Sequence, residues 1–78
     1  MVYPSLASLV ITLDGLALTA RAGDRDHYLH MLSEARRHGA SDEQILDAYR
    51  WGRRGLGAAP FDHEGKTPAD RARTTEDT

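Results

Sequence analysis

Hydrophobic residues recur at helical spacing in three segments of this chain. In residues 4–22 the apolar positions form one stripe about 120° wide at about 100° per residue, made by Leu6, Leu9, Val10, Leu13, Leu16, Ala17 and Ala20. Ile11 and Leu18 lie off that stripe. Residues 24–38 and 41–54 each place apolar residues on one face and charged residues on the other. The pattern predicts an all-α fold, a small three-helix bundle.

The first segment also fits a β-hairpin. Asp14-Gly15 is typical of a two-residue type I′ turn, and such a turn would pair Leu13 with Leu16. We favour the helix because seven apolar residues follow its period. An N-terminal β-hairpin followed by two helices is the alternative fold.

Residues that begin and end helices separate the segments. Asp24 and Ser41 precede the second and third helices, where a side-chain oxygen can accept from a free backbone amide. Ser41 and Gln44 have the spacing of a capping box. Gly23 and Gly39 follow the first two helices, and glycine commonly ends a helix.

The predicted core is thin for a chain of 78 residues. It consists of Leu6, Leu9, Val10, Leu13, Leu16, Tyr28, Leu32, Ala35, Ile45 and Tyr49. A small core is often supplemented by association. We therefore expect a homodimer or a complex with a protein partner.

The chain divides into a helical domain, residues 1–57, and a flexible acidic tail, residues 58–78. Phe61 is the only large apolar side chain of the tail, and so the tail has little to offset the entropy cost of ordering. Docking of Phe61 onto the bundle would order residues 58–62.

Charge and composition argue against some classes of function and of partner. Residues 1–57 contain seven arginines and seven acidic residues, whereas residues 58–78 carry three positive and five negative charges, which gives the net charge of −2. A neutral domain disfavours nucleic acid as a partner. Residues 6–20 are too polar and too few to span a membrane. The absence of cysteine fits a reducing compartment, and we expect a cytoplasmic protein.

Trp51 is the best candidate for a contact with a partner. At helical spacing it lies more than about 90° from the stripe of Ile45 and Tyr49. A large exposed aromatic side chain among arginines is typical of an interface, and the predicted partner-binding residues are Trp51, Arg50, Arg53 and Arg54. The sequence thus predicts a small, self-associating, non-catalytic interaction module, for which a regulatory role is one option. The alternative for Trp51 is that the tail folds over it through Phe61.

A DNA-binding helix-turn-helix over residues 28–54 is an alternative function. The run Ala-x3-Gly-x5-Ile in residues 35–45 has the spacing that packs two short helices across a tight turn. However, the presumed recognition helix begins with Asp42 and Glu43, whose carboxylates would face phosphates.

The sequence predicts no catalytic residue, no cofactor and no metal site. Its serines lie in capping or helix-surface positions without a neighbouring base, and it has no glycine-rich phosphate loop. His27, His30 and Glu34 share a helix face, but such a row is more often a solvated surface than a metal site.

Residues 9–50 resemble the helical hairpin of the carboxymuconolactone decarboxylase and AhpD-like family. The resemblance lies in the run Ala-x3-Gly-Ala-Ser-x3-Ile-Leu, here residues 35–46. It implies a similar packing of two helices and, for the family's redox members, a Cys-x-x-Cys pair on the second helix. This chain has no cysteine. The resemblance therefore implies a degenerate member without peroxidase chemistry, as a third alternative.

Overall fold

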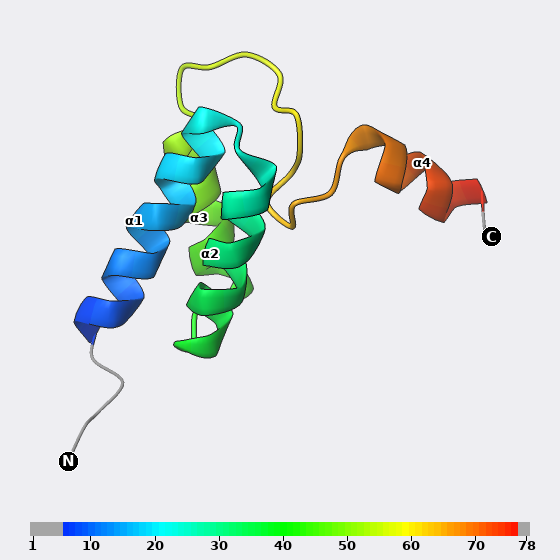
Figure 1. Ribbon diagram of the computed structural model, residues 1–78. Helices are drawn as coiled ribbons and strands as arrows, with labels where there is room; N and C mark the ends of the chain where they lie inside the picture. The colour runs from blue at the N-terminus through cyan, green and yellow to red at the C-terminus, as the bar shows by residue number, and fades with distance from the viewer. Residues whose placement is uncertain (1–5, 77–78) are drawn as a thin grey trace.

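The computed structural model describes residues 6–76, and it describes the side chains of residues 7–72. Three helices lie alongside one another, α1 (Leu6–Ala22), α2 (Arg25–Arg37) and α3 (Asp42–Gly52), and α1 packs against both others (Figure 1). A fourth helix, α4 (Pro68–Glu76), projects to one side of this bundle. Within residues 6–76 there is no strand. The predicted all-α, three-helix bundle is therefore confirmed.

The helix ends follow local side-chain chemistry. The Asp24 carboxylate accepts a hydrogen bond from the His27 amide at the start of α2. Ser41 and Gln44 form both hydrogen bonds of the capping box at the start of α3. Gly23 follows α1 with φ of +71°, a conformation that a side chain would strain. The predicted second and third segments, 24–38 and 41–54, thus contain α2 and α3 together with their caps.

The β-hairpin alternative for the first segment is wrong. Asp14 and Gly15 lie in the middle of α1 as ordinary helical residues. Gly15 has a packing role there, because an added Cβ would meet the end of the Met31 side chain on α2. A two-stranded hairpin is marginal in water, whereas the single helix buries Leu16 and Ala20 between two others. The N-terminal end of the predicted 4–22 segment, residues 4–5, lies outside the described residues.

The buried core consists of Leu16, Ala20, Tyr28, Leu32, Ala35, Ile45 and Phe61. Leu13 and Tyr49, also predicted for the core, are partly buried against it, and Leu9 is partly buried. Val10 was wrongly assigned to the core, since 53% of it is exposed. It stands only about 80° from Leu18 on the helical wheel, and so it belongs to the edge of the solvent-facing side of α1.

α1 and α3 approach each other closely at Gly52. This glycine is buried, and an added Cβ would collide with the backbone carbonyl of Ala17. The absence of a side chain at position 52 therefore sets the distance between the two helices.

The chain continues to pack beyond the predicted domain boundary at residue 57. Residues 58–67, called the arm below, return from the end of α3 to the side of α2 (Figure 1). Phe61 is 3% exposed and belongs to the core. Thr67 and Asp70 then exchange reciprocal side-chain-to-amide hydrogen bonds at the start of α4. Phe61 thus docks onto the bundle, and contacts with the bundle continue past residue 57.

Candidate interaction surface on α1 and α3

Trp51 faces outward, as the helical pattern predicts. Its side chain lies on α3 and is 66% exposed. Beside it is a groove of about 320 Å³ between α1 and α3, lined by Asp14, Ala17, Leu18, Arg21, Trp51 and Gly52. These six residues are called the α1–α3 surface below. Ala17 and Gly52, where the two helices approach closely, contribute only a methyl group and a hydrogen atom to this groove.

α1 exposes large apolar side chains on the side of the helix that carries Leu18. Leu18 is 67% exposed and Ile11 is 66% exposed, and both lie off the stripe that faces the core. The exposed side of α1 therefore combines these two large apolar side chains with the charged Asp14 and Arg21.

Charged groups of both signs border the apolar groove. Asp14 and Arg21 line it from α1, one before and one after Leu18. The Arg54 guanidinium lies over the Trp51 ring, 5.2 Å from its centroid, in a cation–π contact that contributes about 0.5–1 kcal/mol at an exposed site. Arg50 is exposed on α3. A second hollow of about 380 Å³ continues from Trp51 toward Gln44, Asp47 and Leu13. The rim is therefore polar, as in most protein interfaces.

Arg53 differs from the other three predicted partner-binding residues. Its guanidinium donates to the carbonyl of Ala20 at the end of α1 (3.3 Å) and to the carbonyls of Gly57 and Ala58 (3.0 and 3.2 Å). In this position it ties the end of α1 to the chain that leaves α3. We assign Arg53 to the scaffold, whereas Arg54 lies beside Trp51 of the α1–α3 surface.

The arm does not cover Trp51, and the alternative that Phe61 folds over the indole is wrong. The Phe61 ring lies against the rings of Tyr28 and Tyr49, with centroids 5.0 and 6.4 Å away. The Tyr28 hydroxyl donates to the carbonyl of His63 at 2.6 Å, and the Tyr49 hydroxyl donates to the carbonyl of Phe61. Burial raises the pKa of both tyrosine hydroxyls. Both therefore stay protonated and able to donate at neutral pH.

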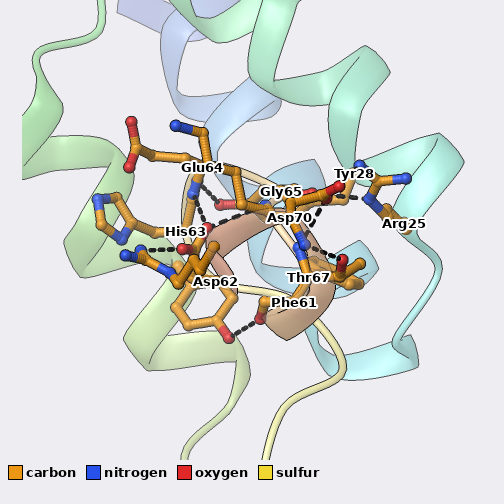
Figure 2. A network of polar contacts seen from close by, with 12 residues as sticks. Arg25, Tyr28, Phe61, Asp62, His63, Glu64, Gly65, Thr67 and Asp70 are labelled. Carbon is orange, nitrogen blue, oxygen red and sulfur yellow. Dashed lines mark hydrogen bonds and ion pairs between the residues drawn. The ribbon is translucent and has the colours of Figure 1, made fainter. Parts of the chain in front are cut away.

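A polar network holds the remainder of the arm in place (Figure 2). The Asp62 carboxylate accepts from the amides of Glu64 (2.9 Å) and Lys66 (3.0 Å) and pairs with Arg71. Partial burial alone would raise the pKa of Asp62, but the Lys66 amide, Arg71 and the Glu64 amide outweigh it and lower the pKa. Arg25 on α2 donates to the carbonyl of Gly65 at 2.7 Å and pairs with Asp70 at 3.2 Å. These contacts join the arm and the start of α4 to α2.

The histidine face of α2 is open to solvent. His27 and His30 are both exposed. A hydrogen bond to Asp24 raises the pKa of His27, and the same bond lowers the pKa of Asp24. In the part of the chain that the structure describes, no three His, Cys, Asp or Glu side chains come together to hold a metal ion. His27 and His30 therefore form no metal site with neighbouring side chains among the described residues.

Two features of this surface are not evident from the sequence. Ile11 and Leu18 lie off the core stripe of α1, but the helical pattern does not show that they lie near Trp51, because it does not say which helices are neighbours. The positions of Asp14 and Arg21, four residues before and three residues after Leu18, do place both charges on the same side of the helix as Leu18.

Comparison of the chain with protein-family models, with curated proteins and with solved structures found no match. No helix within residues 6–76 combines the length and the hydrophobicity that a membrane crossing needs.

Proposed function

We propose that this protein is a small helical interaction module that self-associates through the α1–α3 surface. The observation that carries the proposal is the position of Leu18 and Trp51, which come from different helices and line one groove with two-thirds of each side chain in water. Leaving both exposed forgoes about 1.5–3 kcal/mol of hydrophobic stabilisation per side chain. A contact that covers them both would recover it.

The small core supports the same proposal. Among residues 7–72, two of the seven buried apolar residues are alanines, and the largest fully buried side chains are Tyr28, Leu16 and Ile45. Small domains with few large buried residues are commonly stabilised by association. Burying Ile11, Leu18 and Trp51 at an interface would add to this core the large apolar groups that α1 and α3 do not bury within one copy.

Sedimentation equilibrium of the full chain tests self-association between about 1 µM and about 1 mM, the range in which a weak dimer changes population. We expect the mean mass to rise with concentration. Trp51→Ala should raise the dissociation constant at least about tenfold, because buried aromatic anchors commonly contribute about 2 kcal/mol.

Leu56→Ala is the matched control, because Leu56 is exposed outside the α1–α3 surface. It should leave the dissociation constant unchanged, and circular dichroism should show both variants folded. A wild-type chain that stays monomeric and folded over the whole range would contradict the proposal.

The helix-turn-helix alternative gains no support from the described residues. Asp42 and Glu43 are exposed in the first turn of α3, where base contacts would have to form. Arg53, one of the cations that DNA binding would need, donates instead to three backbone carbonyls. A steep fall of DNA affinity with salt would be the sign of this alternative.

A further inference from the structure

The exposed side of α1 carries a pair of opposite charges that form no ion pair with the other described residues. Asp14 and Arg21 are exposed and line the groove on either side of Leu18. Among the described residues neither side chain forms an ion pair with another. Seven residues of helix separate them by about 10 Å along the axis and return them to nearly the same side. The surface is thus acidic toward the start of α1 and basic toward its end, with an apolar centre.

A surface of this kind is complementary to itself. A two-fold axis perpendicular to α1, passing beside Leu18, would place Asp14 of each copy opposite Arg21 of the other. A parallel arrangement would instead bring Asp14 level with Asp14, and like charges oppose such a contact. The charges therefore distinguish an antiparallel pair of α1 helices from a parallel one.

We propose that the occupant of the α1–α3 surface is a second copy of this chain, packed antiparallel along α1, with two Asp14–Arg21 ion pairs flanking a Leu18–Leu18 contact. This inference rests on the proposed function and specifies its geometry. The proposed occupant is a second copy because the surface carries both a negative and a positive charge. Neither a purely acidic nor a purely basic partner would be complementary to it.

The position of Trp51 agrees with this axis. An axis perpendicular to α1 leaves α3 of both copies on the same side of the α1 pair. Trp51 lines the groove at the level of Asp14, Leu18 and Arg21, and so the two indole rings would close that side of the apolar contact. Arg54, which lies over the Trp51 ring, would remain at the rim, where a cation keeps its hydration.

Charge exchange between the two positions provides the test. Asp14→Arg alone and Arg21→Glu alone each make both intermolecular pairs repulsive, and each should raise the dissociation constant of the homodimer at least about tenfold. Mixing the two variants makes both pairs attractive again. Native mass spectrometry of the mixture, in which the variants differ in mass, should therefore show more heterodimer than random pairing gives. The double variant Asp14→Arg/Arg21→Glu should dimerise like the wild type.

The outcomes separate this geometry from the proposed function. A wild-type dimer whose single variants dimerise equally well and mix at random would overturn the antiparallel arrangement and leave self-association standing. A folded wild-type monomer would overturn both. Circular dichroism of each variant checks that the helices are intact, since both positions are exposed and lie within α1.

Discussion

The hydroxyl of Tyr28 on α2 donates a hydrogen bond of 2.6 Å to the backbone carbonyl of His63, which lies 35 residues further along the chain. Tyr49 makes the corresponding bond from α3 to the carbonyl of Phe61. The two tyrosines therefore hold nearby parts of the arm from two different helices, and Figure 2 labels Tyr28 and the arm residues Phe61 and His63. The Phe61 ring packs against both tyrosine rings, which also contact each other edge to face with centroids 5.8 Å apart, so that the arm completes this part of the core.

Phe61→Ala should destabilise the fold strongly. The Phe61 side chain is 3% exposed and packs against two tyrosine rings, and removing a buried phenylalanine costs about 3–5 kcal/mol. Urea unfolding followed by circular dichroism measures the loss. Leu56→Ala, at an exposed position outside the core, should change the free energy of unfolding by no more than about 0.5 kcal/mol.

A shortened chain of residues 1–57 provides an independent check on the same point. It lacks Phe61 and every acceptor that Tyr28 and Tyr49 use in the arm. We expect it to be at least as destabilised as Phe61→Ala. A shortened chain as stable as the full one would show that the arm contributes nothing to the core.

The features that could be predicted from the sequence are those that depend on residues close together in the chain. The capping box of Ser41 and Gln44 forms within one turn, and its pattern could be recognised without a structure. The outward position of Trp51 follows in the same way from helical spacing. Thr67 and Asp70 give a similar local signal at the start of α4, but the polar composition of residues 58–78 outweighed it in the prediction.

Contacts between distant segments were not predictable in the same way. Asp14-Gly15 is compatible with a turn and with a helix, and the helix is favoured by the burial of Leu16 and Ala20 against the other helices. The candidate site also depends on contacts between distant segments, since Leu18 and Trp51 line one groove only because α1 and α3 pack side by side. Periodicity identifies the exposed face of each helix, but it does not say which faces adjoin.

Replacement by alanine should affect the free energy of unfolding differently at two helical glycines, Gly52 and Gly15. At Gly52 an added Cβ would collide with the backbone of Ala17, and separating two packed helices costs about 1–3 kcal/mol. This exceeds the gain of about 1 kcal/mol that alanine has over glycine within a helix. Gly52→Ala should therefore lower the free energy of unfolding.

Gly15→Ala is the matched comparison within α1. Its added Cβ would meet only the end of the Met31 side chain, which can move aside because methionine is flexible. The helical preference for alanine should then dominate, and the variant should be neutral or more stable by up to about 1 kcal/mol. Urea unfolding of both variants decides the matter, and equal losses at the two positions would contradict the close approach of α1 and α3 at Gly52.

The stability of the fold should fall in acid through the loss of the Asp62 carboxylate. Hydrogen bonds from the Lys66 amide, Arg71 and the Glu64 amide outweigh burial and hold the pKa of Asp62 below its usual value of 3.8. A group whose pKa is lowered by folding stabilises the fold above its unfolded pKa, and this stabilisation disappears as the pH falls through its folded pKa. Asp62→Asn should therefore be less stable than the wild type at neutral pH, and the difference should shrink as the pH falls below 3.8. Urea unfolding of both proteins as a function of pH measures this difference, and a gap that stays constant into strong acid would show that the charge of Asp62 does not hold the arm.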